Sequence, residues 1–372
     1  MSVTENCWIR LMTSNVFILF FFLFFILTIL LVLLRVSSKN QLPFYLLFWV
    51  FLILFAGFNT ASPDYDGYKH IAEQVGSFED FADGSTKNLH GDITFYLISS
   101  FVNTFELDIQ FVFIIMAFIS ISITSFVVFK LSNNPFVSLI LYGSHHYLNK
   151  DVIQIRAGLS SSLLLLTVLL ISYRHKIFAS YSYFFSVMSH SSSLIALPPI
   201  MATMLISRQQ LSRLLVAVII VGFVIHVLGG FFGLLKYIEI FLPQGVKNYI
   251  DWQLYNYDMG LFNLSSIRAL FISSALIFFL NRVEQSRSDV IFISCYIMGT
   301  FLLIAFSDFA ILAGRLSSIL MSAEIILLVN LASKLKKIKF LLLVVFYALL
   351  VFLNNVLFSP FNLGEFSFDL IS

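Results

Sequence analysis

The sequence predicts an all-α polytopic membrane protein with about 12 transmembrane helices, given that a span needs ~20 apolar residues. Hydrophobic residues make up 59% of the 372-residue chain and charged residues 11%, whereas soluble domains usually carry about 25% charged residues. The mean hydropathy is +0.94, and apolar runs recur along the whole chain. We therefore expect residues 1–372 to form a single integral membrane domain.

The apolar runs define the helices that we expect. They lie at residues 16–34, 42–60, 109–129, 136–148, 157–172, 177–189, 193–206, 214–228, 264–281, 290–307, 316–333 and 340–357. Two of them, 136–148 and 177–189, are short for a span, so polar ends inside the bundle would have to extend them. The first run lacks the small-residue exit site of a cleavable signal peptide, and it is long enough to stay as an anchor.

The distribution of lysine and arginine predicts the orientation of the helices. With the N-terminus outside, the short inward loops collect most of the basic residues, and most of the acidic residues lie outside. Two longer segments, 61–110 and 229–263, then face outward, where residues 93–105 could form a short amphipathic or re-entrant helix. The second segment is rich in Tyr, Trp, Asn and Asp, a mixture that suits sugar recognition or an interfacial aromatic belt.

Composition and motifs exclude several classes of function. A net charge of +2 suggests no nucleic-acid partner. We find no phosphate-cradling glycine loop, zinc spacing or dinucleotide fingerprint, so no metal or cofactor is expected. Cys7 and Cys295 do not look like a pair, because one is N-terminal and the other lies in an apolar run. The 44 phenylalanines suit lipid-facing and interfacial surfaces.

The stretch Asn149–Leu170, NKDVIQIRAGLSSSLLLLTVLL, combines polar residues with the start of an apolar run. On a helix, Gln154, Gly158 and Ser162 fall on one face at four-residue spacing, and the small residues would let a second helix approach closely. The small residues of the stretch are Gly158, Ser160, Ser161 and Ser162. Arg156 lies near the hydrocarbon, where a cation is costly without a partner. It is either a phosphate-binding arginine at the mouth of a pocket or an arginine that snorkels to the headgroups.

Acidic residues supply further candidates. In DYDGYKH, Asp64 or Asp66 could orient or deprotonate a sugar hydroxyl, with Tyr68 beside them, although a solvated loop has the same composition. Asp92 precedes an apolar stretch, where it is either a substrate-binding residue or a helix N-cap.

Histidine and arginine residues complete the candidate site. His190, in MSHSSSLIALPP, could accept a proton or bridge phosphate and hydroxyl, or it could be structural. Arg315 begins a predicted span in AILAGRLSSIL, and Arg268 lies about a turn into another. If their helices are neighbours, these two and Arg156 form one outer anion site, since a guanidinium matches phosphate oxygens. Independent snorkelling of each arginine is the alternative.

Four of these stretches, taken in order, resemble segments of the EpsG-type polysaccharide polymerases, a family related to the Wzy O-antigen polymerases. They are FNTASPDYDGYKHI, NKDVIQIRAGLSSSLLLL, FFSVMSHSSSLIALPPI and GRLSSILM. The resemblance covers roughly residues 40 to 330. The family often has an arginine after the second span, where this chain has Asn59, which puts a phosphate contact from that position in doubt.

The resemblance implies a multi-pass bacterial inner-membrane enzyme that polymerises O-antigen or capsule with its active site facing the periplasm. Its substrates would be oligosaccharide repeat units on undecaprenyl diphosphate. Its partners would be membrane lipid, a flippase and a chain-length regulator, and the resemblance implies no cofactor. Arg156, Arg315 and Arg268 would then hold the diphosphate. Asp64, Asp66 or His190 would activate the acceptor hydroxyl. Gln154, Tyr68 and Asp92 would bind and position the substrate.

Two other functions fit a membrane protein of this composition. A lipid-linked oligosaccharide flippase would need a polar path across the bilayer, and Glu324 is the only clear charge that we place in mid-span. A membrane acyltransferase acting on sugars would need a catalytic residue nearer the inner side. The only notable inward histidine is His175, which reads better as part of a topology anchor. Both functions are disfavoured.

Overall fold

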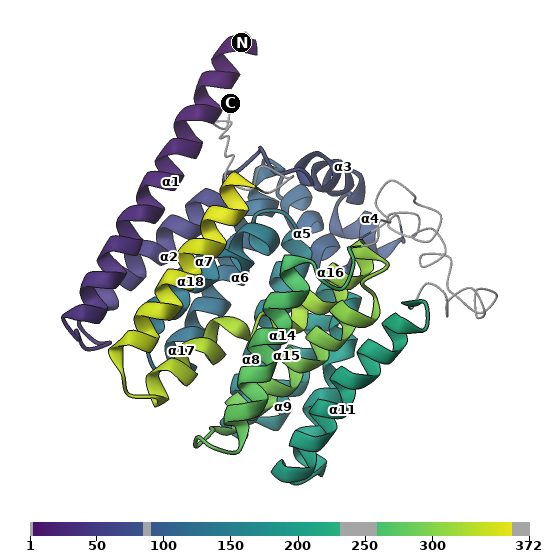
Figure 1. The fold of residues 1–372 in the computed structure, drawn as a ribbon. Coiled ribbons are helices and arrows are strands. Elements are labelled where there is room, and N and C mark those ends of the chain that lie inside the picture. The colour runs from purple at the N-terminus through teal and green to yellow at the C-terminus, as the bar shows by residue number, and fades with distance from the viewer. Residues whose placement is uncertain (1–2, 85–90, 231–258, 359–372) are drawn as a thin grey trace. The chain divides into compact units, whose positions relative to one another are not determined.

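The computed structural model describes residues 3–84, 91–230 and 259–358 (Figure 1). Within those ranges the regular structure is helical throughout, and no strand occurs. The all-α prediction is confirmed. The chain divides into two compact units, one of Met1–Ser191 with Ile325–Ser372 and one of Ser192–Glu324. We call them unit 1 and unit 2 and describe each by itself.

Unit 1 contains the N-terminal half of the chain and the last helices. Its elements are α1 (Val3–Leu33), α2 (Leu42–Gly57), α3 (Tyr65–Val75), α4 (Phe78–Ala82), α5 (Ile93–Thr104), α6 (Gln110–Leu131), α7 (Pro135–Ser144), the π-helical turn η2 (Tyr147–Asp151), α8 (Ile155–Ser172), α9 (Lys176–Ser189) and α18 (Ile338–Leu357). The short 3₁₀ helix η3 (Ser191–Ala196) and α17 (Glu324–Lys334) begin at its boundaries with unit 2. Unit 2 holds α10 (Leu197–Leu205), α11 (Arg208–Val227), α14 (Leu264–Leu280), α15 (Arg287–Ala305) and α16 (Ala310–Met321).

Among the described residues, six helices are long and apolar enough to cross a membrane, namely α1 from Ser14 onward, α6, α8, α11, α15 and α18. Leu312–Met321 and α17 meet at a bend of 44° and would make a seventh, broken span. Each of the expected apolar runs falls on a helix, but several are short, such as α7 with 10 residues. The count of about 12 spans therefore stays a prediction. Residues 93–104 form α5, in line with the short helix expected there.

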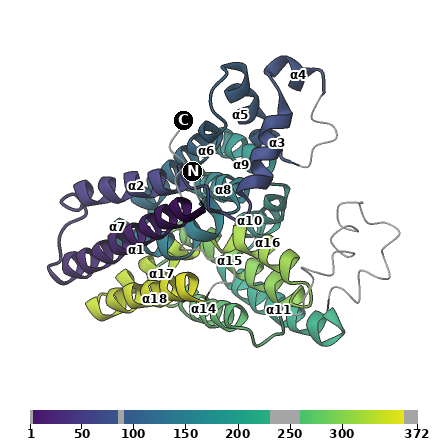
Figure 2. The ribbon, with the colours of Figure 1, turned by 90° about the horizontal axis from the view of Figure 1, so that it is seen from above.

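Aromatic packing joins α1, α2 and α18 in unit 1. Phe17, Phe21, Phe48 and Phe352 are completely buried. The rings of Phe21 and Phe352 stack with centroids 4.1 Å apart, and α1 and α2 lie side by side in Figure 2. The interpretation of phenylalanine as a lipid-facing residue is wrong for this group. Lipid gives helices no hydrophobic reason to associate, so flat rings that pack closely between them supply much of the attraction.

Small residues bring α8 and α9 close together, as the sequence predicts for Ser160. The Ser160 hydroxyl donates to the Ser186 carbonyl and the Ser186 hydroxyl donates to the Ser160 carbonyl, both at 2.8 Å. Ser182 donates to the carbonyl of Leu163 at 2.8 Å. These interhelical bonds hold the two antiparallel helices at a fixed height, so the start of α8 and the end of α9 lie at the same end of unit 1.

We expect Ser186→Leu to destabilise the folded protein by about 1–3 kcal/mol, because the larger side chain must separate two closely packed helices. Ser180→Leu is the matched control, since Ser180 is an exposed residue of the same helix. Unfolding of both variants in detergent by denaturant titration measures the difference. Equal stability of the two variants would contradict this account of the α8–α9 contact.

A layer of short helices lies across the end of unit 1 at which α6 begins (Figure 1). A core of buried residues from α3, α5, α6 and α8 attaches this layer, including Tyr68, Phe95 and Ile155. Gln110 fixes its edge, because its side chain donates to the Gly57 carbonyl at 2.7 Å and accepts from the Tyr65 hydroxyl at 2.7 Å. The described part of the expected segment 61–110 is thus folded. Of the segment 229–263, residues 231–258 lie outside the described residues.

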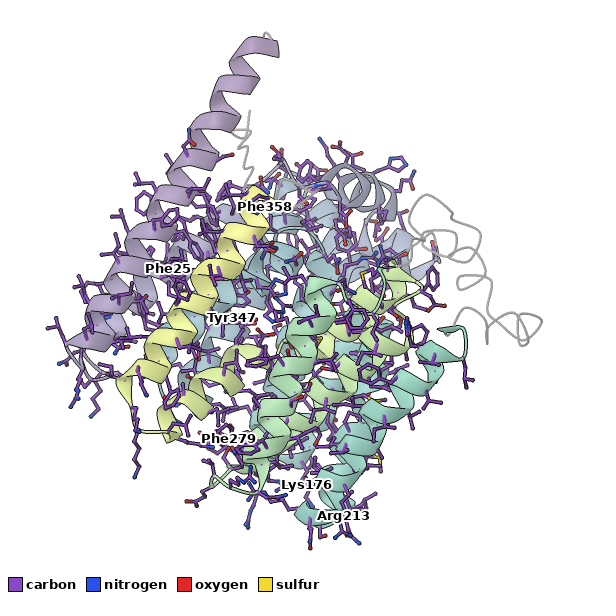
Figure 3. All side chains as sticks on the ribbon, viewed as in Figure 1. Phe25, Lys176, Arg213, Phe279, Tyr347 and Phe358 are labelled. Atoms are coloured by element: carbon purple, nitrogen blue, oxygen red, sulfur yellow. The ribbon has the colours of Figure 1, made fainter. Side chains whose placement is uncertain are left out.

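The start of α9 and the end of α18 lie at opposite ends of unit 1. Figure 3 shows Lys176, at the start of α9, at the end of the unit opposite to Phe358, which follows α18. The predicted topology places these two residues on opposite sides of the membrane. The direction of the helices relative to inside and outside stays a prediction.

Candidate functional site

The carboxylate of Asp92 joins two predicted site residues. Its Oδ2 lies 2.9 Å from Nη1 of Arg156 and 3.4 Å from Nδ1 of His190. Asp92 is also the residue before α5, but its side chain makes no capping hydrogen bond to that helix. Asp92 is therefore the N-cap residue of α5 by position, as predicted, but its side chain contacts the arginine and the histidine instead of capping the helix.

The packing of α8 against α9 explains why these residues meet. Arg156 is in the first turn of α8, and His190 directly follows the last residue of α9. Because the two helices are antiparallel neighbours, both residues lie at one end of the pair, and α5 brings Asp92 to the same end. The Ser189 hydroxyl donates to Thr94 Oγ1 at 3.1 Å, which joins the end of α9 to the start of α5.

The ring of Tyr68 forms one wall of the site. The guanidinium carbon of Arg156 lies 5.3 Å from the ring centroid, a distance that allows a cation–π interaction. Tyr68 is itself held in the core, with its ring centroid 5.5 Å from that of Phe95. We call Tyr68, Asp92, Arg156 and His190 the Asp92 cluster. It joins α3, α5, α8 and α9.

The Asp92 cluster is mostly covered but reachable. The side chains of Arg156, Asp92 and His190 are 18%, 17% and 19% exposed. Charged groups interact more strongly there than in bulk water. Arg156 Nε is buried and makes no hydrogen bond within the described residues, so the guanidinium keeps donor capacity after its contact with Asp92. A guanidinium can bind an anion in a bidentate manner, but Nε itself is enclosed in this structure.

Tyr96 borders the cluster from α5. Burial raises the pKa of its phenol, so the hydroxyl stays protonated at neutral pH and remains a hydrogen-bond donor. A Cβ atom on Gly91 would lie 2.6 Å from the Tyr96 ring. A larger residue at position 91 would push the Tyr96 ring away from its present place beside Asp92.

Other residues predicted near the site occupy different surroundings. Gln154 precedes α8 and is half-buried, without a capping hydrogen bond from its side chain. Asp64 directly precedes α3 and is also half-buried. Asp66 is exposed in the first turn of α3, while Tyr68, two residues on, faces the core. Catalytic roles for Asp64 and Asp66 stay predictions.

Arg268 and Arg315 belong to unit 2. Arg268 lies in the second turn of α14 and Arg315 in the second turn of α16, and both are half-buried. Arg156 belongs to unit 1. The expectation that the three arginines hold one anion stays a prediction.

The sequence pattern did not predict the burial of Lys150 and Asp151. They are 2% and 4% exposed and lie in η2. Glu324 is therefore not the only charged residue in the interior of a unit. It is 2% exposed, at the bend between α16 and α17, and accepts from the Tyr296 hydroxyl at 3.3 Å. The shortness of the run 136–148 was the available signal, because a chain that cannot cross must turn inside the bundle.

Asn59, which stands where the family often has an arginine, is 3% exposed. Its side-chain oxygen accepts from the backbone N–H of Ala61 at 3.0 Å, a contact that shapes the turn after α2. The residue therefore has a local structural role in this chain.

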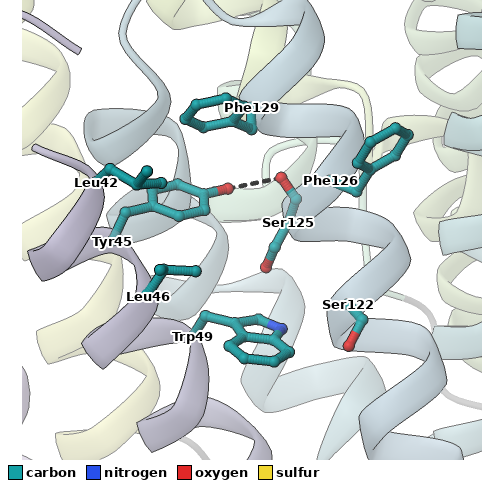
Figure 4. Close-up of a pocket in the computed structure, with 8 residues that line it drawn as sticks. All are labelled: Leu42, Tyr45, Leu46, Trp49, Ser122, Ser125, Phe126 and Phe129. Carbon is teal, nitrogen blue, oxygen red and sulfur yellow. Dashed lines mark hydrogen bonds between the residues drawn. The ribbon is translucent and has the colours of Figure 1, made fainter. Parts of the chain in front are cut away.

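An apolar groove with a volume of about 240 Å³ lies between α2 and α6 (Figure 4). Leu42, Leu46, Trp49, Phe126 and Phe129 line it together with Tyr45, Ser122 and Ser125. The Tyr45 hydroxyl crosses to the Ser125 carbonyl at 2.6 Å. The groove lies at the opposite end of α6 from Gln110, so it is separate from the Asp92 cluster.

The fold and the site together define a class: an all-helical membrane protein in which short helices cover an Asp–Arg–His cluster at one end of a bundle. The model of the EpsG family matches residues 42–368. The chain belongs to the EpsG family. It is similar to the amylovoran biosynthesis protein AmsC of Erwinia amylovora, with 27% identity over 306 residues, which cover 78% of this chain and 79% of that protein. No solved structure matches the chain.

Proposed function

We propose that this protein is a polysaccharide polymerase, a membrane glycosyltransferase that joins oligosaccharide repeat units carried on undecaprenyl diphosphate. The product would be O-antigen or capsule, made at the periplasmic face of the inner membrane. Membership of the EpsG family supports a role in polysaccharide synthesis, as does the similarity to an amylovoran biosynthesis protein. The single observation that supports the chemistry is the Asp92 cluster, which combines an anion-binding group with a proton acceptor.

In this proposal Arg156 holds the diphosphate of the donor. A lipid diphosphate keeps its chain in the bilayer and its charge at the surface, which is where a partly exposed arginine at a helix end can reach it. Nη1 of the guanidinium contacts Asp92, and a planar guanidinium has further N–H groups that can donate to phosphate oxygens. When the glycosidic bond to the lipid carrier breaks, the arginine stabilises the charge that develops on the departing diphosphate.

His190 takes the proton from the acceptor hydroxyl. If its Nδ1 carries hydrogen and donates to Asp92, the Nε2 atom is the basic nitrogen. Asp92 then fixes the tautomer and stabilises the imidazolium that forms, as the carboxylate does in an Asp–His pair. The oxygen of the acceptor sugar attacks the anomeric carbon of the donor while the bond to the diphosphate breaks, and the proton ends on His190.

The remaining predicted residues and partners keep supporting roles. Arg268 and Arg315 would add positive charge for the diphosphate, and Gln154 and Tyr68 would position the substrates. Asp64 or Asp66 is the alternative acceptor base. A flippase would supply the lipid-linked units, and a chain-length regulator would act on the polymerase.

A deletion strain tests the proposal against its two alternatives. Loss of a polymerase leaves a lipid core capped by a single repeat unit in the banding pattern of the surface polysaccharide. Loss of a flippase leaves no exposed unit, and loss of an acyltransferase leaves a full ladder of altered mass. We expect the single-unit pattern, with the ladder restored by the full chain in trans.

A further inference from the structure

Two buried charged residues lie in the turn that leads to Arg156. Lys150 and Asp151 belong to η2, a π-helical turn between α7 and α8, and they are 2% and 4% exposed. The Asp151 carboxylate reaches Ser120, which is near the middle of the 22-residue helix α6. The pair is therefore enclosed well below the end of the bundle. Charged side chains at such depth are costly, and apolar residues would stabilise a helix bundle better.

Asp151 ties three elements together. Its Oδ1 accepts from the Ser120 hydroxyl of α6, and its Oδ2 accepts from the Tyr142 hydroxyl of α7 at 2.5 Å. A Cβ atom on Gly158 would lie 2.8 Å from Asp151 Oδ1, so the glycine in α8 leaves room for the carboxylate in this position. Two charge-assisted hydrogen bonds give this carboxylate a fixed direction.

Lys150 fastens the same turn to α8. Its Nζ donates to the Ser161 hydroxyl at 3.0 Å. Its carbonyl oxygen would lie 3.2 Å from a Cβ on Gly158, so its backbone also lies flat against the helix. The turn and the first two turns of α8 therefore form one block.

Arg156 lies within this block, in the first turn of α8. Val152, Ile153 and Gln154 alone separate Asp151 from α8, and Val152 and Ile153 are 6% and 9% exposed. A connection of three residues, two of them buried, cannot absorb a shift of the turn. A shift would carry α8, with α9 packed on it, away from α5, and so move Arg156 and His190 away from Asp92.

We propose that Lys150 and Asp151 are positioning residues, which set the height of α8 so that Arg156 and His190 meet Asp92. This role concerns the site to which the proposed function assigns donor binding and acceptor activation. The proposal rests on that function only where it predicts an effect on polymer formation. The geometric part of the proposal can be tested without activity.

Two cysteine pairs measure the geometry in the full chain with Cys7 and Cys295 replaced by alanine. Thr94→Cys with Ser189→Cys reports the gap between α5 and α9 beside the cluster, where the native hydroxyls are 3.1 Å apart. Ser160→Cys with Ser186→Cys reports the α8–α9 contact, where the hydroxyls are 3.2 Å apart. Disulfide formation is measured in membranes under mild oxidant, together with the polysaccharide ladder and the amount of protein.

We expect Asp151→Ala to lower cross-linking of the Thr94/Ser189 pair by about tenfold, since it removes two hydrogen bonds to a charged group. Cross-linking of the Ser160/Ser186 pair should stay unchanged, and polymer should be lost. Tyr142→Phe removes one of the two bonds and should lower the first cross-link by about threefold. The Tyr142→Phe variant also tests the inference if Asp151→Ala protein fails to accumulate. Glu324→Gln is the matched control, another buried carboxylate bonded to a tyrosine, and should change neither cross-link.

Wild-type cross-linking of the Thr94/Ser189 pair in Asp151→Ala or Tyr142→Phe protein would overturn the inference, with or without loss of polymer. Equal loss of both cross-links would also overturn it, because it would indicate general loss of packing. If instead Arg156→Ala cells keep a full ladder, the proposed function fails, and the cross-linking result stands on its own.

Discussion

Cells that carry Arg156→Ala are expected to make no polymer, although the protein should insert and accumulate normally. The substitution removes the group that we assign to the diphosphate and leaves the Asp92 carboxylate without its cationic partner. Loss of one preorganised group that stabilises transition-state charge typically costs about 10²–10³ in rate, enough to erase a ladder that requires many successive transfers.

Arg156→Lys should also impair polymer formation. A lysine offers one compact charge, which cannot hold Asp92 and two phosphate oxygens at once as a planar guanidinium can. It would also lose the stacking of the guanidinium on the Tyr68 ring. We therefore expect short chains or single units, between the alanine variant and the wild type.

The banding pattern of the surface polysaccharide, normalised to the amount of protein in the membrane, measures both variants. Arg213→Ala is the matched control, because Arg213 is an exposed arginine of α11 in the other unit. It should leave the ladder intact. Full-length polymer in Arg156→Ala cells would refute the role that we give to Arg156.

The second large effect concerns the proton acceptor. We expect His190→Ala to lower the rate of repeat-unit transfer by about 10²–10⁴, the usual contribution of a general base. Asp92→Asn should have an effect of the same order. An amide can present its NH₂ group to Nδ1, which favours the tautomer that lacks the basic Nε2. Rates are measured in membranes with lipid-linked repeat units at saturating concentration.

The alternative bases provide the comparison. Asp64→Asn and Asp66→Asn protein should keep most of the transfer rate if His190 is the base. If either variant loses as much activity as we expect for His190→Ala, while His190→Ala remains active, the assignment of the base is wrong.

Much of the fold could be predicted because its signal is local. Each expected apolar run contains or overlaps a helix, and the short helix α5 was expected at residues 93–105. Helical spans in a membrane must satisfy their own backbone hydrogen bonds, so hydropathy along the chain identifies them. The role of the phenylalanines could not be read in this way. The same residue type suits lipid contact and helix packing, and packing contacts such as that between Phe21 and Phe352 distinguish the two.

The site was predicted residue by residue but not as an arrangement. Arg156, His190, Tyr68 and Asp92 were each chosen for their chemistry, yet Asp92 had an equally good explanation as a helix cap. His190 is 98 positions away from Asp92 in the sequence, and no periodicity links positions at that separation. The antiparallel packing of α8 on α9 and the placement of α5 beside them decide that the residues meet.

Lys150 and Asp151 show most clearly what could not be predicted from the sequence. In the sequence they read as polar residues at the edge of a span, whereas the structure buries them against Gly158 and α6. By itself, the sequence determined that this chain is helical and membrane-embedded, and it supplied the side chains to which we assign anion binding and proton transfer. Tertiary structure decided which of these side chains share a site and which charges are enclosed. Hydropathy depends on each residue and its neighbours along the chain, whereas burial and ion pairing depend on residues that only packing brings together.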